Sequence, residues 1–151
     1  MTDLQIRPAI AGDIPDIVAM LFDDELGAQR ETPGDLTPYL RAFELIDSDP
    51  RQHLLVAVHD GKPAGTLQLT LIAGLSRQGA TRAVIEAVRV RSDLRGEGIG
   101  SGLVQAAVQR ARELGASMVQ LTSDATRVDA HRFYRQLGFE QSHVGFKLPL
   151  P

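Results

Sequence analysis

The chain has 151 residues, no cysteine and a net charge of −3, with 43% hydrophobic and 23% charged residues. This length and composition fit a single domain over residues 1–151 with one hydrophobic core, and the lack of cysteine excludes disulfides, zinc–thiolate sites and a cysteine nucleophile. The charge gives no reason to expect a nucleic acid or a membrane as partner. No apolar run reaches the ~18 residues of a membrane span and no signal peptide is recognisable, so we expect a cytoplasmic protein.

The first third of the chain predicts one strand and two helices. Residues Leu4–Arg7 alternate in polarity and stop at Pro8, which is typical of a short strand. Asp13 is a candidate N-cap for a helix that runs to about Leu21, because apolar residues then recur at helical spacing. After a polar loop, a second helix is expected over Pro38–Asp47.

The middle of the chain predicts a hairpin followed by a third strand. Residues Gln52–His59 and Gly65–Ile72 read as strands, and Asp60-Gly61 between them is a strong signal for a two-residue turn. A glycine-containing loop over residues 73–81 leads to an apolar strand over Ala83–Val90.

The stretch Val88–Gly102, VRVRSDLRGEGIGSG, runs from that strand through a glycine-rich turn into a helix from Ile99 to about Leu114. The first N–H groups of a helix lack internal partners and favour an anion, and glycines let the backbone approach it. The loop is not a P-loop, and Ser101 occupies the third glycine of the dinucleotide fingerprint. The alternative is a turn that needs glycines for its geometry alone.

The rest of the chain predicts a strand over Ser117–Thr122, parallel to the strand before the glycine-rich turn, because a helix connects the two. A helix over Arg127–Leu137 and a last strand near His143–Leu148 follow. The predicted order is β-α-α-β-β-β-α-β-α-β, an α+β fold with a sheet of mixed direction.

Two motifs resemble those of the GNAT superfamily of N-acetyltransferases: Arg95-x-x-Gly98-x-Gly100 and, one helix and one strand later, A-x-x-F-Y-x-x-x-G-F over Ala130–Phe139. The resemblance implies the GNAT fold, a mixed and mostly antiparallel sheet flanked by helices. It also implies direct transfer of an acetyl group from acetyl-CoA to a primary amine of a small molecule or peptide in a ternary complex. Because His53, His59 and His131 lack metal-ligand spacing, no metal site is expected. A homodimer is a family-level expectation. The rival interpretation is a non-catalytic acyl-CoA-binding or regulatory domain.

The resemblance assigns cofactor contacts to the glycine-rich turn and to the strand before it. The pyrophosphate would be bound by the segment Arg95, Gly96, Glu97, Gly98, Ile99, Gly100 and Ser101. A backbone N–H of Val88, or of a neighbour such as Arg89, would polarise the thioester carbonyl where the strand splays, and Val88 and Val90 would pair with pantetheine. Arg127 stands where the family often has Asn; it could reach the pantetheine or the 3′-phosphate, or it could be a solvated arginine.

Two residues are candidates for proton transfer. Glu86 interrupts an apolar strand, which is costly without a role or a partner, and relatives carry a base there. The alternatives are a solvent-facing Glu86 or one paired with Arg89 or Arg82. Tyr134 matches the tyrosine that protonates the leaving thiolate, although its helical spacing also fits a core residue. The acidic run at residues 23–25 could attract a cationic amine or could be a solvated helix end.

Overall fold

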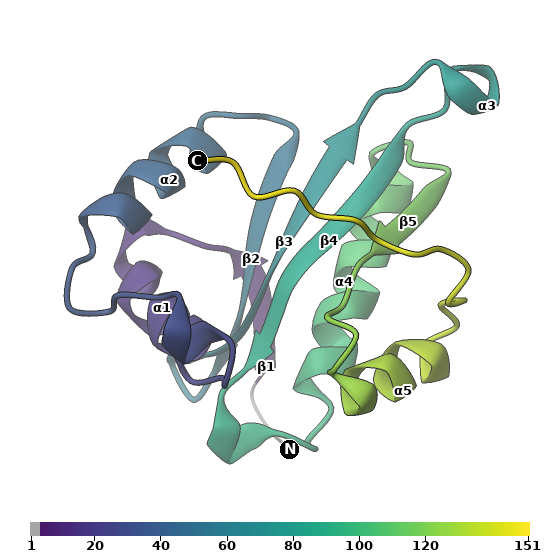
Figure 1. Ribbon diagram of the computed structural model, residues 1–151. Coiled ribbons are helices and arrows are strands. Elements are labelled where there is room, and N and C mark those ends of the chain that lie inside the picture. Colours follow the sequence, from purple (N-terminus) through teal and green to yellow (C-terminus); the bar gives the residue numbers. More distant parts are fainter. Residues whose placement is uncertain (1–3) are drawn as a thin grey trace.

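The computed structural model describes residues 4–151 and has one five-stranded sheet in the order β1-β2-β3-β4-β5 (Figure 1). The strands are β1 (Leu4–Pro8), β2 (Gln52–His59), β3 (Lys62–Ile72), β4 (Arg82–Val90) and β5 (Met118–Leu121). Neighbours are antiparallel from β1 to β4, whereas β4 and β5 are parallel. The predicted α+β class with a mixed, mostly antiparallel sheet is confirmed.

Helices cover both faces of the sheet. The helices α1 (Ile14–Phe22) and α2 (Thr37–Asp47) pack on one face, and α4 (Ile99–Glu113) packs on the other with α5 (Val128–Gln136) beside it (Figure 1). Shorter elements are α3 (Ser76–Gly79) and the 3-10 turns η1 (Ala11–Asp13), η2 (Gly27–Gln29) and η3 (Ser92–Leu94). Within residues 4–151, no helix has the length and apolarity needed to cross a membrane.

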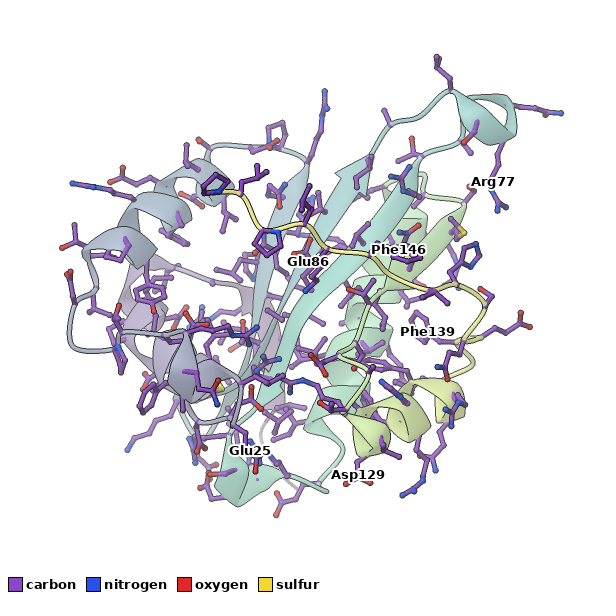
Figure 2. All side chains as sticks on the ribbon, viewed as in Figure 1. Glu25, Arg77, Glu86, Asp129, Phe139 and Phe146 are labelled. Carbon is purple, nitrogen blue, oxygen red and sulfur yellow. The ribbon has the colours of Figure 1, made fainter. Side chains whose placement is uncertain are left out.

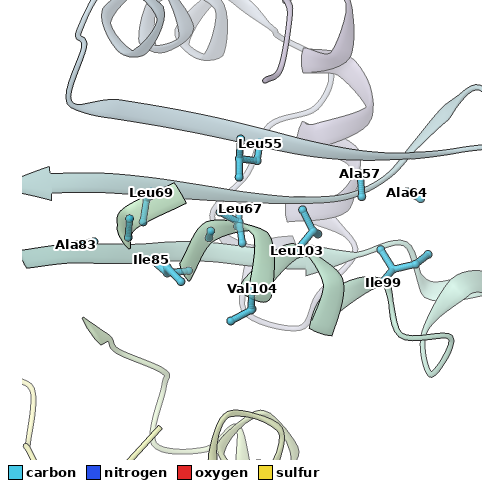
Figure 3. Packing of buried hydrophobic residues seen from close by; sticks show 12 residues of the cluster. Leu55, Ala57, Ala64, Leu67, Leu69, Ala83, Ile85, Ile99, Leu103 and Val104 are labelled. Atoms are coloured by element: carbon cyan, nitrogen blue, oxygen red, sulfur yellow. The ribbon is translucent and has the colours of Figure 1, made fainter. Parts of the chain in front are cut away.

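Strand β2 has apolar side chains on both faces, which explains why helices pack on both sides of the sheet. Leu55 and Ala57 belong to the hydrophobic cluster under α4, while Val56 between them belongs to the cluster under α1 and α2. Successive side chains of a strand point to opposite faces, so this strand is apolar on both. On the α4 side Leu67 and Leu103 are fully buried (Figure 3), and each such side chain stabilises the fold by about 1.5–3 kcal/mol.

The predicted hairpin is confirmed. Asp60 and Gly61 connect β2 to β3 with φ angles of +50° and +77°. Two positive φ angles give the turn whose twist matches that of the flanking strands, and glycine adopts them without steric cost. Pairing continues to His59 and Lys62, so β3 begins earlier than the predicted Gly65.

Asp13 does not have the predicted N-cap role, because its side chain makes no capping bond to the first turn of α1. Its carboxylate is 4% exposed and accepts hydrogen bonds from the Arg7 guanidinium at 2.8 and 3.1 Å and from the Ile10 N–H at 2.8 Å. Burial favours the neutral acid, but these partners outweigh it and hold the pKa of Asp13 below its ordinary value. The residue therefore anchors β1 to the start of α1.

The prediction of a last strand near His143–Leu148 is wrong. Residues 140–151, the C-terminal segment, form no strand, and Val144, Phe146 and Leu148 are 80%, 93% and 84% exposed. Alternating polarity supplies the side chains of a strand, but a strand also needs an edge for its backbone groups. Figure 1 shows the segment running from α5 toward α2 outside the sheet. The observed order therefore ends at α5, and the short α3 is an addition to the predicted order.

Candidate active site

Strand β4 carries a bulge at the position where the sequence predicts the catalytic backbone. Glu86 pairs with Gln68 and Arg89 pairs with Thr66, so two residues of β4 stand opposite one residue of β3. Within the bulge, Ala87 has a φ of +54°. A left-handed conformation is unfavourable for a residue with a Cβ, and such strain is typical of functional sites.

The same strand separates from its other neighbour just before the bulge. The parallel pairing of β4 with β5 ends at Ile85 and Leu121. Beyond Ile85, β4 has no strand neighbour on that side in the described part of the chain. Backbone groups of the second half of β4 are therefore left for another partner.

The glycine-rich turn forms an open loop at the N-terminus of α4. Gly96 and Gly98 have φ angles of +82° and +85°, and no atom lies within 4 Å of a Cβ built on either. Gly98 immediately precedes α4, and no side chain of the described residues caps the helix. A Cβ at Gly100 would lie 3.4 Å from the Phe133 ring and 3.5 Å from Val90. The loop thus presents uncapped N–H groups to an approaching anion.

Arg95 connects this loop to the end of α1. Its Nε donates to the Val90 carbonyl at 3.3 Å, and another guanidinium nitrogen donates to the Asp23 carbonyl at 3.4 Å. Arg95 also lines a shallow groove together with Phe22 and Glu25 at the end of α1. The groove places an exposed guanidinium at the rim of the glycine loop.

Tyr134 lies on α5 in a partly buried aromatic group. Its ring packs edge-on against Phe133 at 5.1 Å and against Phe139 at 6.0 Å between centroids. Burial raises the pKa of the Tyr134 hydroxyl above its ordinary value, against the opposing charges of Arg89 and Arg127. A tyrosine that keeps its proton is suited to act as an acid.

One carboxylate binds guanidiniums from two distant elements. Asp24, in the loop after α1, accepts two hydrogen bonds from Arg127 at 3.1 and 2.7 Å, and its Oδ2 lies 3.7 Å from a guanidinium nitrogen of Arg89. Burial favours neutral Asp24, but the bonds from Arg127 and the Gly27 N–H outweigh it, so the pKa of Asp24 lies below its ordinary value. Asp24 is therefore neutralised by arginines and is not available to attract an amine.

Glu86 is exposed on β4. In the view of Figure 2, Glu86 is well separated from Glu25, which belongs to the acidic run at residues 23–25. No salt bridge joins Glu86 to Arg89 or Arg82 within residues 4–151. Its cross-strand neighbour Gln68 donates to the amide oxygen of Gln52 at 2.9 Å. The carboxylate thus lies at the edge of a polar patch on this face of the sheet.

Comparison with known proteins assigns the family. The model of the "Acetyltransferase (GNAT) family" matches residues 18–139. The chain belongs to the GNAT family of acetyltransferases. That range contains the bulge, the glycine loop, Tyr134 and Phe139 of this GNAT protein.

Two curated relatives and a solved structure match most of the chain. An aminoalkylphosphonate N-acetyltransferase of Salmonella typhimurium is 36% identical over 145 residues, covering 94% of this chain and 88% of the relative. An L-methionine sulfoximine/L-methionine sulfone acetyltransferase of Pseudomonas paraeruginosa is 30% identical over 142 residues, covering 91% and 80%. A crystal structure described as a transcriptional regulator from Bacillus halodurans is 46% identical with a TM-score of 0.95, covering 97% and 99%.

These relatives establish the reaction class. The GNAT protein is an acetyltransferase that moves an acetyl group to an amine, and its family takes that group from acetyl-CoA. The family and both curated relatives are enzymes by name, so they give no support to the non-catalytic alternative. Among the described residues, no group of His, Asp and Glu is arranged to hold a metal ion.

The structure brings most residues predicted for the GNAT site to one end of the molecule. The loop Arg95–Ser101 and Val90 lie beside Phe133 of α5, and Tyr134 lies near Arg89 and Arg127. The Ile99 side chain is buried, so only its backbone faces the loop, whereas the Glu97 side chain is exposed. The contact predicted between Arg127 and the cofactor stays a prediction, since its guanidinium is bonded to Asp24.

Sequence reasoning missed two features of the GNAT site. The first is the pairing of Asp24 with two arginines. The second is the polar patch, in which Thr70 and Gln68 both donate to Gln52. The sequence does carry a signal for this patch, because polar residues that recur at every second position share one face of a strand. Gln68 and Thr70 are two positions apart on β3, and Gln52 lies on the neighbouring β2.

Proposed function

We propose that this GNAT protein transfers the acetyl group of acetyl-CoA directly to a primary amine in a ternary complex. The observation that carries the proposal is the separation of β4 from β5 beside the uncapped N-terminus of α4. This arrangement leaves backbone donors for both the acyl arm and the phosphates of one bound molecule.

The glycine loop fits the pyrophosphate of acetyl-CoA. The backbone at Gly96 and Gly98 is open, and the α4 dipole favours negative charge at this end. Arg95 would add a charge-assisted hydrogen bond at the rim, since its contacts to backbone carbonyls are long. Glu97 lies within the loop and contributes its backbone.

The bulge supplies the groups for the thioester. We assign the Val88 N–H to the carbonyl oxygen of the acetyl group and the main chain of Val88–Val90 to the pantetheine arm. A fixed N–H that meets developing negative charge lowers a barrier by about 3 kcal/mol. Since the left-handed Ala87 fixes the direction of the strand, this donor needs no reorganisation.

Glu86 and Tyr134 complete the proposed chemistry. Glu86, directly or through water, takes a proton from the acceptor ammonium, and the free amine then attacks the thioester carbonyl. Tyr134, whose pKa burial raises, donates a proton to the thiolate that leaves. Glu86 faces solvent, which suits a base that meets a cationic substrate. Tyr134 lies among aromatic rings, which suits an acid that protonates a sulfur leaving group.

The acceptor we propose is a small molecule. The names of the Salmonella and Pseudomonas relatives give an aminoalkylphosphonate and methionine derivatives, and both curated matches cover most of this chain. A peptide amine is the alternative acceptor.

The test of the function is ligand-dependent stability followed by turnover. Acetyl-CoA at 100 times its Kd is expected to add about 2.7 kcal/mol to the free energy of unfolding, well above the effect of equal ADP. Acetylation of added amines is then followed by release of CoA. If neither ligand stabilises the protein, the loop is only a turn and the proposal fails.

We further propose a homodimer located in the cytoplasm. Support for the dimer comes from the C-terminal segment, in which Val144, Phe146, Leu148 and Leu150 are 80–93% exposed (Figure 2 labels Phe146). A second copy would remove this apolar surface from water, and the edge strand β5 is free to receive the segment. Light scattering of the full chain is expected to give a dimer that Phe146→Ser weakens. Leu75→Ser, at an equally exposed leucine, is the control, and a monomeric wild type contradicts the dimer.

A further inference from the structure

The cluster around Arg89 holds more positive charge than its carboxylate neutralises. The charged side chains that act on Arg89 include two further guanidiniums, of Arg127 and Arg30, and one carboxylate, that of Asp24. That carboxylate already accepts two hydrogen bonds from Arg127 and one from the Gly27 N–H at 3.0 Å. Asp24 therefore has little capacity left for Arg89.

Arg89 itself is poorly compensated for its degree of burial. Its side chain is 16% exposed, and its contact to Asp24, at 3.7 Å, is longer than a hydrogen bond. One guanidinium nitrogen donates to the Val88 carbonyl at 2.9 Å, while the buried Nε has no hydrogen-bond partner within residues 4–151. A guanidinium offers five N–H donors and rarely stays buried without an anion. Its surroundings indicate a missing acceptor.

Arg89 lies close to the residues proposed for acetyl transfer, so an anion bound to Arg89 would lie close to them as well. Thr66 and Gln68 are two residues apart on β3 and share one face, so their partners Arg89 and Glu86 share that face as well. Two positions along a strand span about 7 Å. Tyr134 lies close enough to Arg89 for the two side chains to interact electrostatically. An anion at Arg89 and an amine at Glu86 therefore fit within one small molecule.

We propose that Arg89, flanked by Arg127 and Arg30, binds an acid group carried by the acceptor, so that the substrate is a small amine with a carboxylate or phosphonate a few bonds away. The inference rests on the proposed function, because it places the acceptor amine at Glu86. Both acids offer oxygens that a guanidinium binds in a bidentate manner. The acid fixes the acceptor, and Glu86 then takes the proton of its amine.

The experiment compares matched acceptors. Initial rates of CoA release are measured with 2-aminoethylphosphonate, β-alanine and propylamine, and with methionine against its decarboxylated amine. In calorimetric titrations of the CoA-loaded protein, the acid-bearing member of each set is expected to bind at least tenfold more tightly than the amine without an acid group. Tenfold corresponds to about 1.4 kcal/mol. The phosphonate and carboxylate arms show which acid is preferred.

Variants assign the preference to the cluster. Arg89→Gln is expected to raise KM for the acid-bearing acceptors at least tenfold more than KM for propylamine, while Arg89→Lys keeps part of the preference. The Arg30 side chain makes no hydrogen bond within the described residues, so Arg30→Gln removes a charge without breaking a contact. This variant should therefore weaken anion binding even if Arg89→Gln folds poorly. Arg112→Gln, at the far end of α4, is the control with wild-type kinetics.

The outcomes separate the two proposals. Three results would each overturn the role of Arg89. They are equal binding of the members with and without an acid group, a preference that survives both Arg89→Gln and Arg30→Gln, and no detectable binding of the acid-bearing members. Weaker acetyl-CoA binding in Arg89→Gln with unchanged acceptor KM also overturns it, because the cluster then serves a cofactor phosphate. Failure of every amine to release CoA, with anion binding intact, counts instead against the proposed function.

Discussion

The carboxylate of Asp24 accepts two hydrogen bonds from the guanidinium of Arg127, at 3.1 and 2.7 Å, across 103 residues of sequence. Asp24 follows α1, and Arg127 immediately precedes α5. One ion pair therefore joins helices that pack on opposite sides of the sheet, at the end where β4 and β5 have separated.

Asp24→Asn is expected to lower the free energy of unfolding by about 1–3 kcal/mol at neutral pH, because charge-assisted bonds are lost and two guanidiniums lose their shared counter-charge. The folded-state pKa of Asp24 lies below the unfolded value. Its stabilisation is therefore complete above the unfolded pKa of about 3.9 and is lost as the pH falls through the folded value. Urea unfolding between pH 7 and pH 3 measures both effects, and the variant should lose less stability on acidification.

Asp93→Asn is the matched control for this prediction. Asp93 also accepts two guanidinium bonds, from Arg91 at 2.7 and 2.9 Å, but both side chains lie at the surface. Exposed ion pairs contribute little because water screens them. No measurable change is expected, and an effect as large as that of Asp24→Asn would contradict the importance of the partly buried site.

Gly98→Ala is expected to weaken acetyl-CoA binding several-fold. Gly98 and Gly115 precede and follow α4 with φ angles of +85° and +88°, and both have open space around a Cβ. Alanine at either glycine should cost about 1–2 kcal/mol of stability through the same backbone strain. Calorimetric titration with acetyl-CoA should detect a loss only for Gly98→Ala. Equal affinity of the two variants would mean that the loop does not bind the cofactor.

Most of the fold was predictable because the elements follow local patterns. The turn at Asp60-Gly61 and the helix that begins at Ile99 were placed by short-range chemistry, and the structure confirms both. The last strand could not be judged in this way, since Val144, Phe146 and Leu148 alternate correctly but the segment pairs with no strand of the sheet. Asp13 fits an N-cap by sequence, but the distant Arg7 binds its carboxylate instead.

The site was predictable in its residue types but not in its pairings. The motif placed Gly98 and Tyr134, while the partnership of Asp24 with Arg89 and Arg127 depends on how separate elements pack. The left-handed Ala87 illustrates the same limit, because no local sequence signal marks an alanine for a bulge. The strain at that residue is imposed by pairing on both sides of the bulge, at Glu86 and at Arg89.

Glu86→Gln is expected to reduce kcat by about 10²–10⁴-fold, most at low pH, and to leave acetyl-CoA affinity unchanged. At low pH the acceptor is protonated and depends most on a base, whereas at high pH free amine is available. The measurement is the pH profile of kcat with the preferred acceptor. Gln68→Ala, at the cross-strand neighbour, is a useful comparison because it alters the polar patch without removing a base. An unaltered profile in Glu86→Gln would exclude Glu86 as the base.

Tyr134→Phe is expected to lower kcat while changing the free energy of unfolding by less than about 0.5 kcal/mol, since the ring stays and the hydroxyl has no hydrogen bond within the described residues. Tyr39→Phe provides the opposite control. The Tyr39 hydroxyl accepts from the Thr32 N–H at 2.8 Å and donates to Glu31 at 3.1 Å. That variant should lose about 1 kcal/mol of stability and keep wild-type kcat. Steady-state kinetics and urea unfolding on both variants separate the roles, and full activity in Tyr134→Phe would leave Tyr134 a packing role alone.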